Sequence, residues 1–349
     1  MRTAHAWAGA VLSLLIAVLG LSGTLLVFKR DYLRASFAAA RADVDYAPER
    51  MGAALEAIEA RFASEGLLYV TLAGPELGIH KAVFADGGAA YFDQDGALLA
   101  RWGRNGRIED WLFDLHHHLL AGETGELVAG VAALAAIMLA LTGLIIAAPA
   151  LRRFAWRLSP RSPSRRDLLA SHRDLGLIFA APILLLALTG AAMVFPDEAK
   201  AILRAATRSA PSAQAPSPAA GPGDVNWRLA LEEAHAAFPS AAPRIASWPR
   251  SANGPASLRL RQPREWHPNG RTYVTIDPAT SQAAALADSE ALSAGERAFN
   301  ALYPLHGAFV GGRIYQALSA LAGLALAGLG LTGAWAFAAR QRRRPQPSP

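Results

Sequence analysis

The chain has 349 residues, of which 52% are hydrophobic and only 18% charged, and its mean hydropathy is positive. This balance is unusual for a soluble domain and predicts membrane-spanning segments. The absence of cysteine excludes disulfides, iron–sulfur clusters, thiolate zinc sites and covalently attached c-type haem. The net charge of +6 does not indicate a nucleic-acid partner, because most basic residues lie beside apolar segments, where membrane topology explains them.

The first apolar segment, residues 4–28, is long enough to cross a membrane and ends abruptly at Lys29 and Arg30. A hydrocarbon core of about 30 Å requires about 20 helical residues. A cleaved signal peptide, with a cleavage site near 38–40, is the alternative, but the apolar region is long for a signal. We therefore predict an uncleaved first transmembrane helix that contacts membrane lipid.

Residues 48–102 read as a soluble insert of the α+β class. A helix is predicted at its start, and its apolar side chains share one face: Met51, Leu55, Ile58 and Phe62. Strands are predicted at 67–71 and 81–84, followed by a strand that ends in an Asp-Gly turn at Asp95. His80 is expected to be a surface residue.

Two further spans follow this insert. The second covers 110–148, including an extension at its outer face, and Pro149 ends it. A cytoplasmic basic loop, 149–173, contains seven arginines, and the third span, 174–196, tolerates Pro182 in its interior.

The remaining chain repeats the same order. A flexible linker rich in Pro, Ala, Ser and Gly is predicted at 205–224. A second soluble insert, 225–300, again begins with a helix and continues with strands, at 257–261 and 272–278. The fourth span covers 304–338, and a basic tail occupies 339–349.

The distribution of basic residues predicts the orientation. Arg2, the arginines of the 149–173 loop and those of the 339–349 tail lie on one side of the spans. Lys29 and Arg30 lie on the other side and are outnumbered. Because cytoplasmic loops carry the excess of basic residues, we expect both termini in the cytoplasm and both inserts outside.

Four histidines occupy matching positions beside the spans. Gly143 follows His116 by 27 residues, and Gly333 follows His306 by the same number. His117 and His118 do not give this match. In the other two spans, His5 and His172 each have one glycine four residues later and another eighteen residues later. This periodicity predicts a duplicated unit of two histidine-bearing spans around a soluble insert, and hence four transmembrane helices.

The predicted topology brings the histidines together in pairs, with His5 and His172 at the cytoplasmic face and His116 and His306 at the outer face. Two imidazoles from different helices are what a b-type haem needs for bis-axial ligation, and small residues such as Gly9 and Gly176 let a flat macrocycle approach a helix. We therefore predict two noncovalent b haems and a role in electron transfer.

Other interpretations remain for individual residues. A lone histidine such as His5 is often an interfacial residue, and Thr-Gly pairs occur as helix-packing motifs. Zinc at His116, His117 and His118 is an alternative, although adjacent helical residues point in different directions and all three cannot readily share one ion.

Several stretches resemble the PepSY-associated transmembrane family. They are residues 5–9, 115–125, 142–143 and 172–176, and the resemblance extends over nearly the whole chain. Members of that family include bacterial inner-membrane reductases of iron–siderophore complexes. Their ligand histidine is often followed by an arginine, where this chain has His117.

The resemblance implies four spans and two periplasmic PepSY-like inserts in a multi-pass protein of the bacterial inner membrane. It implies an inner haem held by His5 and His172, an outer haem held by His116 and His306, and reduction of a periplasmic ferric siderophore. No nicotinamide or flavin fingerprint is present, so the electron donor would be separate, either a quinol or a cytoplasmic reductase.

A basic and aromatic patch in the second insert is the candidate contact for an anionic chelate. Its residues are Arg259, Arg261, Arg264, Trp266 and Arg271. The alternative is a solvated strand face.

Two other functions remain in competition. The first is a non-enzymatic envelope sensor that the spans merely anchor, and the second is a siderophore permease. Four spans without an intramembrane carboxylate disfavour the permease.

Overall fold

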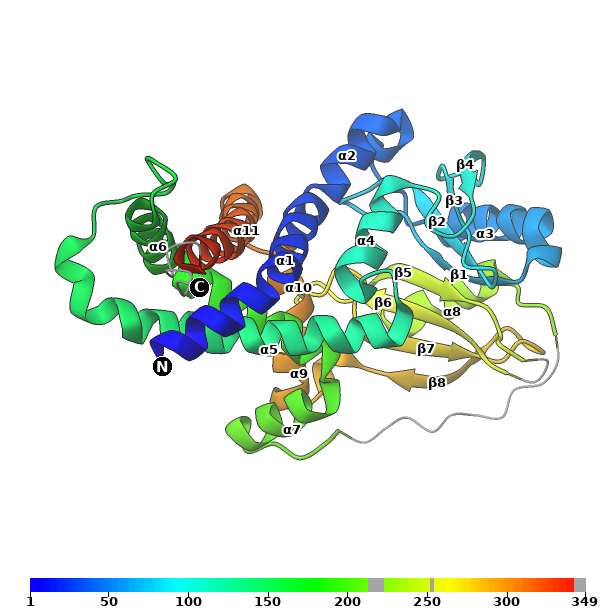
Figure 1. Ribbon diagram of the computed structural model, residues 1–349. Coiled ribbons are helices and arrows are strands. Elements are labelled where there is room, and N and C mark those ends of the chain that lie inside the picture. The colour runs from blue at the N-terminus through cyan, green and yellow to red at the C-terminus, as the bar shows by residue number, and fades with distance from the viewer. Residues whose placement is uncertain (213–222, 252–253, 342–349) are drawn as a thin grey trace, which may run out of the picture. The chain divides into compact units, whose positions relative to one another are not determined.

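The computed structural model describes residues 1–212, 223–251 and 254–341 (Figure 1). The chain divides into two compact units. We call the first the membrane unit, which comprises Met1–Val27, Trp111–Ala199 and the chain from Leu305 onward. The second, the sheet unit, comprises Phe28–Asp110 and Lys200–Pro304.

The membrane unit contains the long apolar helices. Among the described residues, four helices are long and apolar enough to cross a membrane. They are α1 (Arg2–Val27), α5 (Gly122–Ala147, continued by the 3-10 helix Ala148–Arg153), α6 (Arg165–Val194) and α11 (Gly312–Gln341). Large apolar side chains such as Val11 and Ile314 point outward, as expected for a surface that faces lipid.

The second and fourth predicted spans are not single helices. The histidine-bearing segments form separate short helices, α4 (Ile108–His118) and α10 (Leu302–His306). Leu119 and Leu120 have φ of 49° and 59° and end α4, and Ala308 at 54° has the same effect after α10. A left-handed backbone cannot continue a right-handed helix, so the expected segments 110–148 and 304–338 each consist of a short histidine-bearing helix followed by a long apolar one.

Other predicted boundaries also shift. Helix α6 begins at Arg165, inside the expected 149–173 loop, because Ser164 caps it by accepting a hydrogen bond from the Asp167 backbone N–H. Helix α7 (Pro196–Thr207) covers the start of the expected 205–224 linker. Residues 213–222 of that linker and 342–349 of the expected tail lie outside the described residues.

Glycines bring α1 and α11 into close contact. A Cβ added to Gly20 would lie 2.6 Å from the Gly323 carbonyl oxygen, and one added to Gly323 would lie 2.7 Å from that of Gly20. The Thr24 hydroxyl, which bonds to the Gly20 carbonyl, also approaches the carbonyl of Ala320 on α11 at 3.1 Å. Small residues allow backbones to approach in this way, and the polar contact between helices adds to the packing.

The two soluble inserts form one sheet. Its strands are β1 (Leu67–Thr71), β2 (His80–Phe84), β3 (Ala89–Phe92), β4 (Leu98–Trp102), β5 (Ala242–Ser247), β6 (Ala256–Arg261), β7 (Thr272–Ile276) and β8 (Ala283–Ala287). The order is β4-β3-β2-β1-β5-β6-β7-β8, antiparallel throughout. The β1–β5 pair, with Tyr69 opposite Ser247, joins the two inserts, which the sequence predicts as separate units.

Helices α3 (Pro48–Phe62) and α8 (Trp227–Ala237) cover one face of this sheet (Figure 1). All four residues of the predicted apolar face of α3 are buried there, together with Trp227 of α8. A smaller cluster between α2 (Lys29–Ser36) and Tyr91 and Trp102 packs on the other face. Helix α9 (Ala294–Asn300) has a complete capping box from Ser293 and Glu296.

His80 is not a surface residue. It lies at the start of β2, is 1% exposed, and its Nδ1 accepts a hydrogen bond from the Ala73 backbone N–H at 3.0 Å. The strand alternation places it on the same buried face as Ala82 and Phe84. Burial lowers the pKa of His80 to about 4.

The packing of α1 on α11 predicts the effect of Gly323→Ala. The added methyl group would press against the Gly20 carbonyl oxygen and Thr24, and overpacking of this kind costs about 1–3 kcal/mol. We expect a lower melting temperature of the detergent-solubilised protein. Gly328→Ala is the control, because its methyl would meet only the mobile end of Leu175, at 3.2 Å. Equal melting temperatures for the two variants would contradict this packing.

The pKa of His80 predicts a pH-dependent stability. The pKa of His80 is lower in the folded than in the unfolded protein, so unfolding at acidic pH takes up a proton. The contribution of His80 to the free energy of unfolding is therefore complete above pH 6.5 and decreases as the pH drops toward 4. Between pH 7 and pH 5 the loss from this group is about 2 kcal/mol. His80→Asn, which keeps an acceptor for the Ala73 N–H, should flatten the profile in urea unfolding followed by tryptophan fluorescence. The exposed His235 provides the control, His235→Asn, and an unchanged profile in His80→Asn would refute the assignment.

Candidate functional site

His5 and His172 face each other in the membrane unit. His5 lies in the first turns of α1 and His172 in those of α6, and their ring centroids are 6.3 Å apart with the planes at 86°. Two imidazoles that bind one metal from opposite sides, at metal–nitrogen distances of about 2 Å, have centroids roughly 6 Å apart. The spacing of this pair therefore fits two ligands of one metal ion.

His116 and His306 form a second pair. His116 lies near the end of α4 and His306 at the end of α10, and their ring centroids are 6.0 Å apart with the planes at 43°. The left-handed residues that follow each short helix separate these histidines from the long apolar helices. Both predicted pairs are thus present as neighbouring rings.

Each of the four imidazoles has its Nδ1 beside a hydroxyl group. The four contacts are His5–Thr142 at 2.9 Å, His116–Ser22 at 3.0 Å, His172–Thr332 at 3.3 Å and His306–Thr189 at 3.1 Å. A metal-binding histidine usually engages its second ring nitrogen in such a contact, which fixes the orientation of the ring. With Nδ1 engaged, Nε2 is the remaining nitrogen for a ligand bond.

A glycine follows each hydroxyl residue and lies against the ring. A Cβ on Gly143 or Gly333 would lie 3.4 or 3.3 Å from Cε1 of His5 or His172. For Gly23 and Gly190 the corresponding distances, to His116 and His306, are 2.9 and 3.0 Å. A larger residue at Gly23 or Gly190 would displace the outer imidazoles, whereas Gly143 and Gly333 leave the inner rings at or just inside van der Waals contact, so these glycines do more than pack helices.

The sequence-predicted site does not include the four hydroxyl residues, although their positions next to the spaced glycines could have indicated them. Ser22, Thr142, Thr189 and Thr332 directly precede the glycines that define the spacings of 18 and 27. Gly143, which is 27 residues after His116, contacts His5 and not His116. The spacing of 27 therefore reflects the separation of the two histidine pairs along the helices, not the geometry of a single pair.

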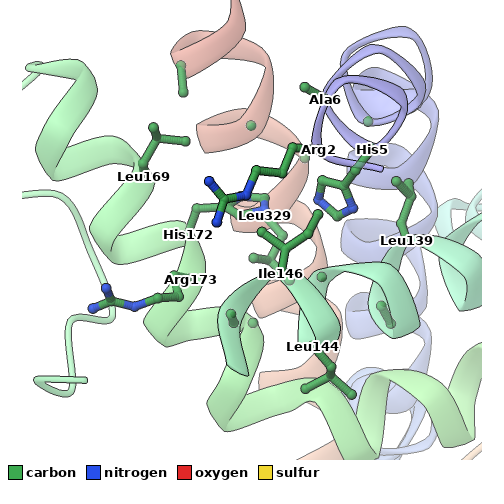
Figure 2. A pocket seen from close by; sticks show the side chains of 18 of the residues that line it. Arg2, His5, Ala6, Leu139, Leu144, Ile146, Leu169, His172, Arg173 and Leu329 are labelled. Atoms are coloured by element: carbon green, nitrogen blue, oxygen red, sulfur yellow. The ribbon is translucent and has the colours of Figure 1, made fainter. Parts of the chain in front are cut away.

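A cavity of about 630 Å³ lies beside His5 and His172, and Figure 2 shows both rings in its wall. Gly9 and Gly176 line it, as predicted. A Cβ on Gly9 would touch only Leu139, at 4.0 Å, and one on Gly176 only Leu329, at 3.6 Å. These glycines therefore border open space, which is what a macrocycle against the helix requires.

The cavity has an apolar lining and a cationic part. Leucine, isoleucine and alanine side chains form most of its wall, and Arg165 also lines it. So do Arg2 and Arg173 (Figure 2). Arg173 is paired with Asp174, whose other oxygen accepts a backbone hydrogen bond from Ala155 at 3.0 Å. An apolar slot with opposed imidazoles and nearby guanidinium groups fits a haem, which is a flat apolar ring with two carboxylates.

His117 and His118 make side-chain contacts with other partners than His116 does. The ring of His117 stacks on Phe113, with centroids 5.2 Å apart and planes at 11°, and its Nδ1 lies 3.1 Å from His118 Nε2. The three consecutive histidines therefore belong to two different groups. This geometry agrees with the choice of His116 by spacing.

The basic patch of the second insert is only partly available to a ligand. On β6, Arg259 donates to the Gly270 carbonyl at 2.8 Å, and Arg261 forms an ion pair with Glu76 at 2.8 Å. Arg271 is half-buried, whereas Arg264 and Trp266 are exposed.

The buried part of this patch surrounds His267. Burial, together with the charges of Arg271, Arg259 and Arg261, lowers the pKa of His267 to about 2. Burial is also the main cause that lowers the pKa of Arg259 to about 10. The patch thus combines a structural cationic interior with an exposed rim.

Comparison with known proteins identifies the family but adds no close relative. No curated protein matches the chain. The family model described as the PepSY-associated TM region matches residues 2–340, which is nearly the whole chain. The resemblance noted in the sequence is confirmed: this multi-pass membrane protein, with four apolar helices and an α+β sheet unit, belongs to the PepSY-associated transmembrane family.

Proposed function

We propose that the protein is a b-type di-haem electron-transfer protein of the bacterial inner membrane, and that it reduces a periplasmic ferric siderophore so that ferrous iron is released. The observation that carries this proposal is the arrangement of four histidines as two facing pairs, each with Nδ1 on a hydroxyl group and the ring against a glycine. A haem bound by each pair would supply reversible one-electron transfer.

The chain's own residues account for binding. The hydroxyl groups of Thr142 and Thr332 orient the inner rings, and those of Ser22 and Thr189 orient the outer rings. His5 and His172 would hold one haem and His116 and His306 the other, and with two histidine ligands each haem would supply electron transfer rather than oxygen chemistry. Arg2 and Arg165, in the wall of the inner cavity, offer charges for the carboxylates of the ring.

The order of the two sites along the helix supports transfer across the membrane. His5 lies near one end of α1, and Gly23, which contacts His116, lies eighteen residues further on. At 1.5 Å per residue the two sites are about 27 Å apart along α1, close to the thickness of a hydrocarbon core. With the basic residues in the cytoplasm, the His5 pair faces the donor, a quinol or a reductase, and the His116 pair faces the periplasm.

The chemistry of the substrate requires little from side chains. Hard oxygen ligands bind ferric iron tightly and ferrous iron more weakly, so one added electron loosens the complex. No protein acid or base is needed for this step. Arg264 and Trp266, on the exposed rim of the basic patch, are the residues that we propose contact an anionic chelate.

The recurrence of the site supports a duplicated origin. The contacts of α1 with α4 and α5 match those of α6 with α10 and α11, residue type for residue type except that Ser22 replaces a threonine. In the sheet unit each half supplies one covering helix and four strands. We propose that the chain consists of two copies of one unit.

Substitution of single histidines tests the pairing. Purified protein supplied with haem should contain two low-spin b haems per chain, and His116→Ala should retain only one, because a ligand of the outer pair is lost. His117→Ala and His118→Ala are matched controls on the same helix and should retain both. Haem content by pyridine haemochrome and the absorption spectrum measure the result. Loss of haem from His117→Ala but not from His116→Ala would refute the pairing, and a haem-free parent would favour the sensor function.

Reduction of a ferric chelate tests the activity. In inverted and right-side-out membrane vesicles, donor-driven formation of ferrous iron, trapped by a coloured ferrous chelator, should occur only on the periplasmic side. His172→Ala should bring this rate to background, because the inner pair is incomplete. After direct chemical reduction, its outer haem should still be oxidised by the ferric chelate in stopped flow. A normal donor-driven rate in His172→Ala would be incompatible with the proposed route.

A further inference from the structure

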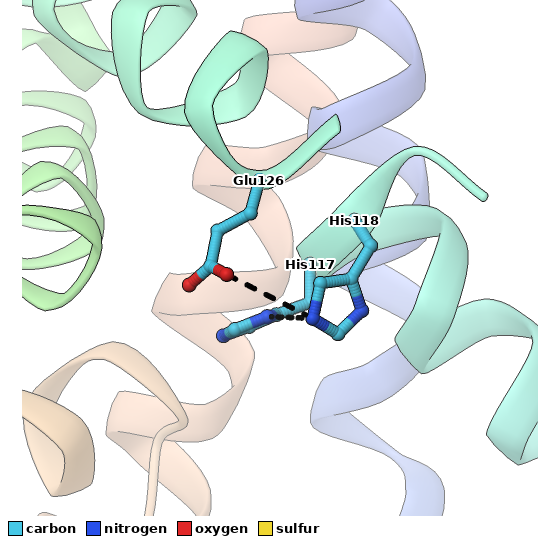
Figure 3. A group of neighbouring side chains, drawn as sticks. All are labelled: His117, His118 and Glu126. Carbon is cyan, nitrogen blue, oxygen red and sulfur yellow. Dashed lines mark hydrogen bonds and ion pairs between the residues drawn. The ribbon is translucent and has the colours of Figure 1, made fainter. Parts of the chain in front are cut away.

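His117, His118 and Glu126 converge in the membrane unit, beside the outer histidine pair. Figure 3 shows the two imidazoles and the carboxylate facing one another. His117 Nδ1 lies 3.1 Å from His118 Nε2, which lies 4.0 Å from Glu126 Oε2, and one ligand atom from each residue falls within 4.8 Å of the others. This histidine–carboxylate cluster shares no residue with the His116–His306 pair.

The spacing of these atoms suits a bound ion. Ligand atoms that bind one ion at about 2.0–2.1 Å in a tetrahedral site lie roughly 3.3 Å apart. The observed separations of 3.1 and 4.0 Å lie on either side of that value. At 4.0 Å the Glu126 oxygen is beyond hydrogen-bond distance of His118 Nε2, which leaves room for an ion between the two atoms.

The chain builds this cluster with a strained turn. His117 and His118 end α4, whereas Glu126 lies in the first turns of α5. The left-handed Leu119 and Leu120 break the helix between them, and such conformations persist only where the surrounding structure enforces them.

Both imidazoles are oriented by a residue one helical turn earlier. Asp114 Oδ1 lies 2.9 Å from Nδ1 of His118, and Phe113 stacks on the ring of His117. A carboxylate on the far nitrogen of a ligand histidine is the usual second partner in metal sites, because it places the proton on Nδ1 and leaves the Nε2 lone pair for the ion. Asp114 is thus a positioning residue.

We propose that His117, His118 and Glu126 bind a divalent first-row transition-metal ion. Two imidazole nitrogens and one carboxylate oxygen suit zinc or ferrous iron, whereas magnesium and calcium prefer oxygen ligands and cuprous copper prefers sulfur. Nothing in this assignment of a metal class depends on haem.

Ferrous iron is the physiological ion that we infer, and this part rests on the proposed function. The cluster begins at the residue after His116, so it lies on the side of the spans where ferrous iron would leave the chelate. A weak histidine–carboxylate site there would accept the ion and reduce its return to the chelate.

Metal binding to the full-length, tag-free protein tests the site. Equilibrium dialysis against zinc, and against ferrous iron without oxygen, should give one saturable ion per chain. His118→Ala and Glu126→Gln should abolish this binding, and Asp114→Asn should weaken it by about 10–100-fold. His235→Ala, which removes an exposed histidine of α8, should bind like the parent, and excess magnesium should not compete.

Haem content separates the two proposals. His118→Ala should keep the haem content of the parent. Size-exclusion chromatography of His118→Ala and of Glu126→Gln checks folding, and each variant should elute as a single species. Saturable binding that survives in both folded variants, or no saturable binding in the parent, overturns the metal site and leaves the haem proposal standing. Metal binding in a protein without haem would refute the proposed function and support the metal site alone.

Discussion

Contact between an imidazole nitrogen and a hydroxyl group on another helix determines the arrangement of the candidate site. His5 on α1 meets Thr142 on α5, and His116 on α4 meets Ser22 on α1, so these contacts link one end of α1 to α5 and the other end to α4. His172 and His306 link α6 to α11 and α10 in the same reciprocal way. Polar groups at membrane depth are costly without a partner, and each contact therefore fixes both a ring and a helix.

These contacts require glycine, and glycine in turn controls how closely the helices approach. Gly143 and Gly333 admit the inner rings, while Gly20 and Gly323 allow α1 to lie directly on α11. Because α6 also packs on α11, the two halves meet along this helix, and His5 and His172 come within reach of each other. The inner pair thus depends on residues that have no side chain to contribute.

Sequence could predict the pairing but not the turns that make it possible. The spacings of 18 and 27 are visible because helices have a fixed rise, so equal offsets place residues at equal depths. Leu119 and Leu120 are ordinary helix formers, and their left-handed conformation arises from tertiary structure that no local pattern reveals. Pairing of β1 with β5 is likewise a contact between distant segments. The burial of His80 could have been predicted, because extension of the expected strand 81–84 by one residue places His80 on the buried face of β2.

The three consecutive histidines show how one helical turn can serve two purposes. Successive residues on an α-helix point about 100° apart, so His116 can face His306 only if His117 points elsewhere. Phe113 and Asp114, one turn earlier, provide separate supports for His117 and His118, and the strained turn brings Glu126 toward them. A shift of one residue in the register of α4 would disturb both groups at once. The outer histidine pair and the histidine–carboxylate cluster are therefore coupled through the backbone, although they share no ligand.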